Sequence, residues 1–568
     1  MEGERKMNLL GRAMDPEFWR EVREDEAYRR YREELLKLWE ENCEQPIYAL
    51  KYSEFKLFGI TGDRSIFQAP YYLRRRALNT SALLSMIYPE EEKYLTRLMD
   101  QIFAMCDEYT WVIPAHQPDL LTKSKVDHLD LFACETAYML SEIYTLLGDR
   151  LDPLIRDRIR VEVDRRLIKQ IMEGKRYGWM KAKHNWNAVC SGSLGCTFML
   201  MRPDLFPEIK PMLDENMEHY LSGLGDDGIC AEGFHYWHYG FGFFTTYADM
   251  VRTFTGGETD YFKRPKVKEV AMFIQRMYLS GNATVTFSDG AQSEWHIGIL
   301  HYLKNEYPDD IVLPPLEYSY HQDPCGRWCW HLRAALWMNK DYLKPEAPKP
   351  AATYFAKDTK WLIHKTPKYG FAIKSGHNAE PHNHNDVGAF ILAVNGKQVV
   401  TDLGSGPYSK QYFAAETRYQ NVHCSSRSHS VPIIGGVYQM NGAEYVSENT
   451  KFENGVFSTD IAKAYPVTEL TSFVRQVSFT DDAVNLHDSF DYSGDGDVID
   501  RIAVNPQPAF GAEGEVLLGD VTIKYDSAKY TVTFETDHAP RGNRTFYYVD
   551  FKPAEGVNEF DLVFDIKG

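Results

Sequence analysis

The 568-residue sequence lacks the features that would assign it to a membrane, secreted or nucleic-acid-binding class. No apolar run is long enough to span a bilayer, and the first residues contain no apolar core of the length that a secretory signal needs. The nine cysteines show no repeating spacing, which favours reduced, buried thiols over a disulfide framework. We therefore expect a cytoplasmic protein without a membrane partner, unless a leader has been removed from the chain.

An excess of basic residues is also missing. Lys and Arg number 63 against 81 Asp and Glu, which gives a formal net charge of -18. Nonspecific binding to nucleic acids needs clustered cations that displace counterions from phosphates, so we expect no nucleic-acid partner. Local basic clusters at residues 74–76 and 175–183 are either solvated helix faces or sources of a short-range positive field.

Hydrophobic and aromatic residues are abundant. With 44% hydrophobic and 14% aromatic residues, the chain can bury two large cores, and more than one domain is expected. Aromatic side chains also stack on sugar rings, although they fill protein cores equally well.

The first part of the chain has helical periodicity. Residues 130–147 carry apolar side chains at three- and four-residue spacing, and Gly148 follows as a stop signal. Comparable segments are predicted at residues 28–41, 71–87, 91–106, 153–172, 185–201, 209–224, 243–254 and 267–279. Successive antiparallel hairpins of this kind tend to form a solenoid or close into a ring.

The last two hundred residues predict short antiparallel strands. Residues 387–394 precede Asn395 and Gly396, a two-residue hairpin turn, and further strands are predicted at residues 472–479, 483–490, 521–525, 530–535 and 546–551. The proline-rich residues 344–353 cannot continue a helix and are interpreted as a linker. The predicted fold is α+β and multidomain, with an N-terminal (α/α) toroid at residues 1–343 and an antiparallel β-sandwich at residues 354–568.

Imidazoles and carboxylates gather where the strands begin. His382 and His384 alternate, so on an extended strand they would share one face. Asp402 ends the next apolar run and His429 comes from a third segment. Two imidazoles and a carboxylate suit zinc or a related divalent ion, whereas the plainer alternative is that these residues cap turns.

Two motifs in the helical part carry polar groups. Residues 184–187 (His-Asn-Trp-Asn) lie at a predicted helix start, where Asn185 could also be only a cap. Residues 232–240 (Glu-Gly-Phe-His-Tyr-Trp-His-Tyr-Gly) contain His235 and Tyr239, which share a face if this segment is helical. Core packing between helices is the alternative interpretation.

From residues 375–390 through Asp402 to His429, the chain resembles the heparinase II/III-like polysaccharide lyases, which include several alginate lyases. The resemblance covers nearly the whole length and implies a helical toroid followed by a β-sandwich. It implies that His382 is catalytic and that His384, Asp402 and His429 bind one divalent metal. This ion is expected to be zinc, with manganese or another divalent ion as alternatives, and mainly structural.

The resemblance also implies roles in the helical part. Asn185 would hold the substrate carboxylate, with His184 or His235 nearby, and Tyr239 would move protons. Tyr236 is the reserve for Tyr239, because alignment within a tyrosine-rich motif can slip.

This chemistry suits a lyase that cleaves uronic-acid glycans by β-elimination. A base removes the C5 proton next to the carboxylate and an acid protonates the leaving oxygen on C4, while hydrogen-bond donors stabilise the developing negative charge. The partner would be an acidic oligosaccharide or polysaccharide such as hyaluronan, chondroitin, heparan sulfate or alginate, with exolytic action as one option. Lys183 and its basic neighbours could favour the phenolate form of a tyrosine base.

Weaker candidates complete the predicted site. Tyr408, Tyr412 and Arg418 lie between Asp402 and His429 and could line a cleft, or form an ordinary surface loop. Residues 288–295 could contact a sugar, although Asp289 and Gly290 more simply make a turn. A metal-dependent glycan hydrolase and a non-catalytic sugar-binding scaffold remain alternatives, and the oligomeric state is left open.

Overall fold

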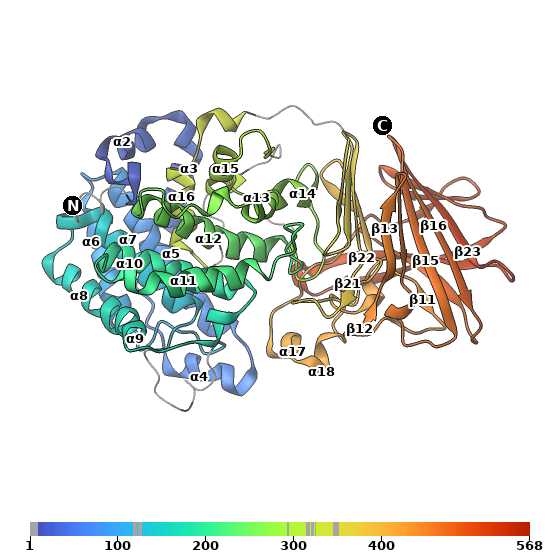
Figure 1. Ribbon diagram of the computed structural model, residues 1–568, viewed down its shortest axis with the longest axis horizontal. Helices are drawn as coiled ribbons and strands as arrows, with labels where there is room; N and C mark the ends of the chain where they lie inside the picture. Colours follow the sequence, from blue (N-terminus) through green and yellow to red (C-terminus); the bar gives the residue numbers. More distant parts are fainter. Residues whose placement is uncertain are drawn as a thin grey trace.

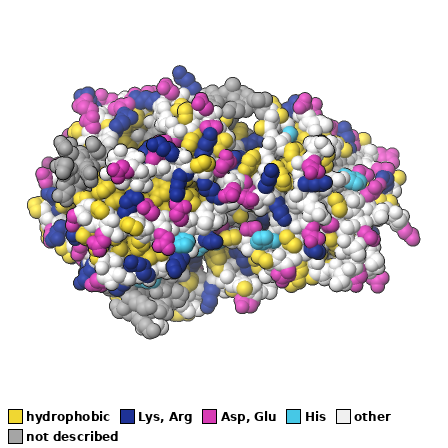
Figure 2. Space-filling view, in the orientation of Figure 1, with side chains coloured by type: hydrophobic (Ala, Val, Ile, Leu, Met, Phe, Trp, Pro, Cys, Tyr) yellow, Lys and Arg dark blue, Asp and Glu magenta, His cyan; other side chains and the backbone are white. Residues whose placement is uncertain are grey.

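The computed structural model describes residues 9–116, 122, 128–291, 295–313, 318–319, 323, 325–344 and 351–567. Figure 1 shows a helical part formed by the first half of the chain, beside a part built of long strands that contains the C-terminus. Figure 2 shows acidic and basic side chains interspersed over the visible face, without a large patch of one sign. Among the described residues, no helix is long and apolar enough to cross a membrane.

The helical part consists of paired helices. α10 (Asn185–Met201) packs against α7 (Leu131–Leu147) and α12 (Phe234–Phe254), and α5 (Ser65–Ile87) packs against α6 (Glu92–Cys106). The other helices are α2 (Pro16–Glu24), α3 (Arg29–Leu38), α4 (Tyr52–Thr61), α8 (Pro153–Val163), α9 (Lys169–Met172), α11 (Phe206–Leu221), α13 (Pro265–Ala271), α14 (Phe273–Met277), α15 (Ile297–Glu306) and α16 (Trp328–Leu336). Every predicted helical segment overlaps a helix of the structure.

One helix differs in extent from the prediction. α12 begins at Phe234 and not at residue 243, so the aromatic motif forms its first turns. The prediction missed the start of α12 because the segment contains Gly240 and Gly242, and glycine is unfavourable inside helices. Close packing explains them: a Cβ at Gly242 would lie 2.1 Å from the Trp330 indole, and one at Gly240 would lie 3.1 Å from Asn185.

The basic cluster at residues 74–76 is not a solvated face. Arg74 and Arg75 are buried and share one carboxylate, with Arg74 Nε 2.9 Å from Glu108 Oε1 and Arg75 Nη2 3.0 Å from Glu108 Oε2. The guanidinium groups therefore belong to the core of the helical part.

Two antiparallel sheets form the second part. One follows the order β21-β22-β17-β10-β9-β7-β6-β5, with β11 (Ile433–Ile434) also paired to β17, and the other follows β13-β14-β15-β16-β23-β20-β19-β18. The bounds in the first sheet are β5 (Ala352–Ala356), β6 (Trp361–Lys365), β7 (Tyr369–Lys374), β9 (Phe390–Val394), β10 (Lys397–Val400), β17 (Val498–Val504), β21 (Tyr530–Ala539) and β22 (Arg544–Pro553). In the second they are β13 (Glu448–Glu453), β14 (Val456–Asp460), β15 (Leu470–Phe479), β16 (Ala483–Tyr492), β18 (Ala509–Phe510), β19 (Glu515–Leu518), β20 (Val521–Lys524) and β23 (Glu559–Ile566).

Apolar side chains from both sheets form a single core, which confirms the predicted sandwich. The predicted hairpin turn is present, since Asn395 and Gly396 both have positive φ between β9 and β10. The last element before the sandwich is the 3₁₀ turn η9 (Lys340–Leu343), and residues 345–350 of the predicted linker lie outside the described residues. The exact domain boundaries stay predictions.

A segment of the helical part lies directly on the first sheet. β1 (Tyr278–Ser280) packs against β7, and Gln398 Nε2 donates to the carbonyl of Thr284 at 2.9 Å. Thr286 Oγ1 then donates to the carbonyl of Asp402 at 3.0 Å. These contacts hold the following residues, 288–291, against the strand ends that carry the histidines.

Candidate active site

His382 and His384 lie in a turn and not on a strand. His382 has φ +57°, a left-handed conformation that is rare outside glycine, and the strand β9 begins only at Phe390. The expected shared strand face is therefore wrong. The turn instead sends His382 toward solvent, with its side chain 26% exposed, and His384 into the interior.

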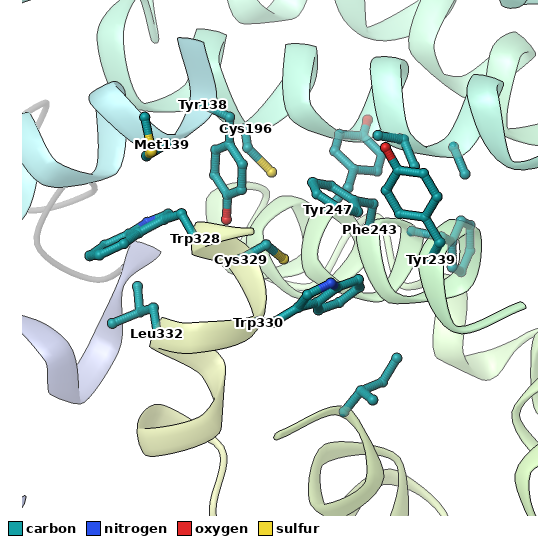
Figure 3. Close-up of a cluster of buried hydrophobic side chains, with 14 of the residues drawn as sticks. Tyr138, Met139, Cys196, Tyr239, Phe243, Tyr247, Trp328, Cys329, Trp330 and Leu332 are labelled. Atoms are coloured by element: carbon teal, nitrogen blue, oxygen red, sulfur yellow. The ribbon is translucent and has the colours of Figure 1, made fainter. Parts of the chain in front are cut away.

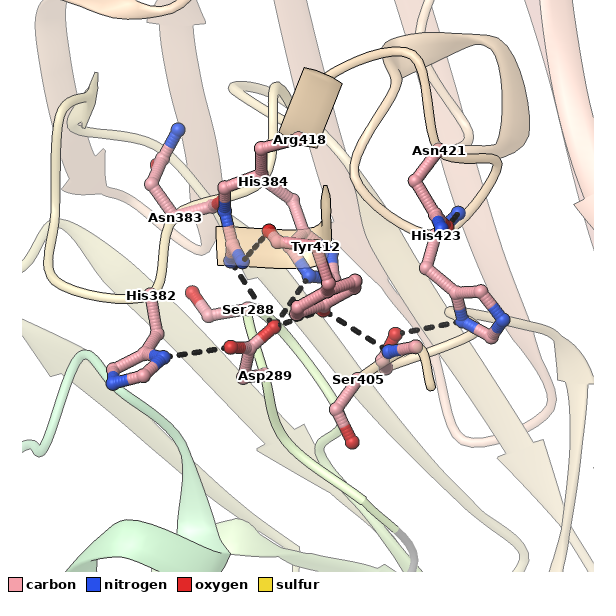
Figure 4. Close-up of polar contacts among 12 residues, drawn as sticks. Ser288, Asp289, His382, Asn383, His384, Ser405, Tyr412, Arg418, Asn421 and His423 are labelled. Atoms are coloured by element: carbon pink, nitrogen blue, oxygen red, sulfur yellow. Dashed lines mark hydrogen bonds and ion pairs between the residues drawn. The ribbon is translucent and has the colours of Figure 1, made fainter. Parts of the chain in front are cut away.

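Asp289 joins the two histidines. Its Oδ2 lies 2.7 Å from His382 Nδ1 and its Oδ1 lies 3.1 Å from His384 Nε2, as Figure 4 shows. The hydroxyl of Tyr412 and Arg418 Nη2, at 3.1 Å, also donate to Oδ1. Burial raises the pKa of Asp289, but the histidine hydrogen bonds and Arg418 outweigh burial and lower this pKa below its usual range. Asp289 is therefore a carboxylate.

Tyr236 reaches His382 from the other part of the molecule. It lies in the first turn of α12, its ring stacks on the imidazole with centroids 4.3 Å apart, and its hydroxyl is 3.4 Å from His382 Nδ1. The hydroxyl also lies 2.6 Å from that of Tyr408. Burial, followed by Tyr408 and Asp289, raises the pKa of Tyr236 well above its ordinary value. The phenol is thus protonated at neutral pH, and the expected phenolate is not favoured.

A second carboxyl group faces the same imidazole. Glu232 Oε2 is 3.5 Å from His382 Nε2, so Glu232 and Asp289 flank the ring at its two nitrogens. Burial raises the pKa of Glu232 to about 7, with the charge of His382 opposing the shift and that of Asp289 adding to it. Glu232 therefore titrates near neutrality.

Tyr239 has different partners. Its hydroxyl donates to Glu135, and the guanidinium of Arg327 lies 3.9 Å from its ring centroid. Figure 3 shows Tyr239 within a cluster of buried side chains that includes Tyr247 and Trp330. Burial raises the pKa of Tyr239 well above its ordinary value. Of the two tyrosines in the motif, the reserve Tyr236 and not Tyr239 makes the described contact with His382.

His184 and Asn185 lie at the start of α10. Asn185 is the first residue of α10 and is 6% exposed. Burial lowers the pKa of His184, a side-chain hydrogen bond from Asn185 raises it, and the charge of His382 lowers it. His184 therefore lies close enough to interact with both Asn185 and His382, and the role of His184 and Asn185 in binding a carboxylate stays a prediction.

The other predicted substrate ligands fall into two groups. His235, Tyr408 and Lys183 are solvent-exposed, and the first two line a cavity of about 420 Å³ together with Asp289. Arg418, by contrast, is 7% exposed and donates to Asp289 and to the carbonyl of Asn383. Its position indicates that it fixes the histidine turn, and no described contact turns it toward the cavity.

His384, Asp402 and His429 are brought together as predicted. They are fully or nearly buried, and one ligand atom from each lies within 4.8 Å of the others. His429 Nδ1 lies 2.9 Å from Asp402 Oδ2, and His429 Nε2 lies 3.2 Å from the carbonyl oxygen of His423. His384 Nε2 donates to Asp289, and its Nδ1 has no partner among the described residues. Two imidazoles and a carboxylate at these distances, with His384 Nδ1 unpartnered in the interior, fit a divalent cation.

A second group of potential ligands contains His384, Asp289 and Cys424. Asp289 already accepts four hydrogen bonds from His382, His384, Tyr412 and Arg418. The first group therefore offers the better metal site.

Sequence reasoning missed the roles of Asp289 and Glu232. Asp289 was interpreted as part of a turn, and Glu232 was quoted within its motif without a function. The sequence offered only residues 288–295 as a possible sugar contact, and in the structure Ser288, next to Asp289, has φ +60°, which is rare outside glycine. No local pattern, however, could place residue 289 beside residue 382.

The fold of the whole chain is that of known polysaccharide lyases. A heparan sulfate lyase from Pedobacter heparinus superposes with a TM-score of 0.61 at 14% identity, over 95% of this chain and 88% of that one. A chondroitin AC lyase from Streptomyces coelicolor A3 superposes with a TM-score of 0.56 at 12% identity, over 97% of this chain and 82% of that one. A structure of heparinase III superposes with a TM-score of 0.62 at 12% identity, over 89% of this chain and 77% of that one. The predicted toroid and sandwich are confirmed.

The family is indicated by the C-terminal part. Residues 349–542 match the family model described as heparinase II/III-like, C-terminal, which confirms the resemblance expected from the sequence. No curated protein matches the chain. The lyase names of the structural neighbours agree with the expectation of a carbon-oxygen lyase.

Proposed function

We propose that this protein is a polysaccharide lyase that cleaves uronic-acid glycans by β-elimination. The proposal rests on the contact between Tyr236 and His382, which come from the two parts of the chain. The Tyr236 hydroxyl lies 3.4 Å from His382 Nδ1, and their partners Tyr408 and Asp289 line a cavity. The substrate class is supported by the structural neighbours, which include a heparan sulfate lyase and a chondroitin AC lyase.

His382 is the proposed base. Asp289 accepts the Nδ1 proton at 2.7 Å, so a neutral imidazole presents its lone pair at Nε2. Nε2 takes the proton from C5, and the resulting imidazolium is stabilised by Asp289 on one side and Glu232, 3.5 Å away, on the other.

Tyr236 is the proposed acid. Its raised pKa keeps the phenol protonated at neutral pH, so the hydroxyl can donate to the departing O4 oxygen. Tyr408, 2.6 Å away, orients this hydroxyl. Asn185 and His184 are the proposed donors to the substrate carboxylate, whose negative charge grows as C5 loses its proton.

His384, Asp402 and His429 are the proposed ligands of one divalent ion, with zinc favoured by two imidazoles and one carboxylate. When bound, the ion links three segments of the sandwich and so fixes the turn that carries His382. The chain's own residues carry the proton transfers.

Product chemistry tests the proposal. Elimination leaves an unsaturated uronate that absorbs in the ultraviolet, whereas hydrolysis leaves saturated ends. We expect absorbance to rise when the protein is incubated with hyaluronan, chondroitin, heparan sulfate, heparin or alginate oligosaccharides. New reducing ends without that absorbance would identify a hydrolase, and the absence of any cleavage across the panel would favour a binding scaffold.

A further inference from the structure

We propose that Arg541 and Arg544 form an anion subsite, which binds a sulfate or carboxylate group on a sugar adjacent to the cleaved uronate. This inference rests on the proposed function for the identity of the glycan. Neither residue belongs to the site described above: Arg541 lies in the connection between β21 and β22, and Arg544 is the first residue of β22.

The subsite is continuous with the active site. The cavity of about 420 Å³ that contains His235, Asp289 and Tyr408 is also lined by Arg541. A second cavity of about 540 Å³ is lined by Arg541 and Arg544, and the two cavities share Ala291, Ser405 and Arg541. Each volume falls within the roughly 300–1,000 Å³ of small-ligand sites. A glycan bound at His382 can therefore extend past Arg541.

Arg541 is held in place without a countercharge. The short turn η12 (Arg541–Asn543) carries it, and its Nη1 donates to the hydroxyl of Ser405 and to the carbonyls of Ser405 and Gly406, at 3.2 and 3.4 Å. No carboxylate of the described residues lies within ion-pair distance of Arg541. Its guanidinium is thus oriented by neutral oxygens, and its charge remains available to a ligand.

Arg544 likewise forms no ion pair with the described residues. It is half-buried, and its Nε and Nη2, two donors on one edge of the guanidinium, have no partner among the described residues. The charge of Asp402 acts on Arg544 from a distance, since no ion pair joins the two side chains, and the Asp402 oxygens contact His429 and the backbone of Gly404.

The contrast with the rest of the chain favours a ligand site. Acidic residues outnumber basic ones by 81 to 63, and most described arginines have carboxylate partners, so two adjacent unpaired guanidinium groups at a cavity are unusual. Guanidinium groups bind the planar or trigonal oxygens of carboxylates and sulfates with paired hydrogen bonds. Sulfated or carboxylated sugars supply such groups, and a neutral glycan would leave both cations without a partner.

The experiment measures binding and not turnover. In a Tyr236→Phe background, dissociation constants are measured by calorimetry for hexasaccharides of heparan sulfate and of chondroitin sulfate, and for their desulfated and carboxyl-reduced forms. We compare two variants with this parent, the single variant Arg541→Ala and the double variant Arg541→Ala/Arg544→Ala. The control is the double variant Lys524→Ala/Lys552→Ala, which also removes two cations. Both lysines are half-exposed and pair with surface carboxylates, Asp565 at 2.7 Å and Asp497 at 2.8 Å.

We expect the double arginine variant to weaken binding of a native hexasaccharide at least tenfold, and the lysine control less than twofold. If the subsite binds sulfate, the arginine variant and its parent should bind the desulfated hexasaccharide equally. If it binds carboxylate, they should bind the carboxyl-reduced hexasaccharide equally. Unchanged binding in the single and double arginine variants, or no binding by the parent, would overturn the subsite. If the wild-type protein produces no unsaturated uronate while the arginine effect persists, the lyase proposal fails and the subsite stands.

Discussion

At the scale of single residues, the chemistry centres on the imidazole of His382. Asp289 accepts its Nδ1 proton, Glu232 lies near Nε2 and Tyr236 stacks on the ring. Each neighbour has a separate consequence for proton transfer, so substitutions can distinguish them.

The two tyrosines of the α12 motif should differ sharply. Tyr236→Phe removes the proposed acid beside His382, and we expect turnover to fall by about 10²- to 10⁴-fold. Tyr239→Phe removes only the hydroxyl that donates to Glu135, and turnover should fall by less than about tenfold. Initial rates of unsaturated-product formation, with circular dichroism as a folding control, check this. Comparable losses in both variants would refute the assignment.

The carboxyl group of Glu232 should make stability depend on pH. Burial raises its pKa in the folded protein to about 7, above the ordinary value of 4.5, so the folded state holds this proton more tightly than the unfolded state. The stabilising contribution of the protonated Glu232 side chain to the free energy of unfolding is fully present below about pH 4.5 and is lost as pH rises through about 7. Relative to Glu232→Gln, the wild type should therefore lose thermal stability between pH 5 and pH 8. A constant difference in Tm over that range would show that Glu232 is not buried as a neutral acid.

At the scale of elements, α12 and the segment 278–291 position the site. α12 carries Glu232's neighbour Tyr236 toward the sandwich, and residues 278–291 lie on the first sheet and deliver Asp289. Both depend on close packing that local propensity does not reveal.

Gly242 tests the packing of α12. A Cβ there would lie 2.1 Å from the Trp330 indole, so Gly242→Ala should destabilise the protein by about 1–3 kcal/mol, although alanine is the better helix former. Gly178→Ala is the matched control, because nothing lies within 4 Å of its added Cβ and its φ is ordinary. Denaturant midpoints of the two variants give the comparison. Equal changes in the denaturant midpoint of the two variants would mean that Trp330 moves aside without lowering the free energy of unfolding.

At the scale of the whole molecule, the proposed metal joins segments of the sandwich that are distant in sequence. We expect His384→Ala to lose bound zinc and to lower Tm, because one of the three proposed ligands would be missing and the binding energy of the ion would be lost. Chelation of the wild type should lower Tm in the same direction, and added zinc should restore it. Metal content is measured by atomic spectrometry. His487→Ala, a substitution of a surface histidine paired with Asp561, should leave metal content unchanged.

The sequence by itself determined the helical and strand-rich parts, the hairpin at Asn395 and the group of His384, Asp402 and His429. Periodicity and turn residues are local properties, and the three residues of the group were expected from the family resemblance of the motif that contains them. Only the tertiary structure decided that Tyr236 and not Tyr239 contacts His382, that Asp289 and Glu232 flank it, and that Arg541 and Arg544 share a cavity. The physical reason is that hydrogen bonds, burial and unpaired charge depend on which side chains meet in space, and the partners of His382 come from segments 93 residues or more away in the sequence.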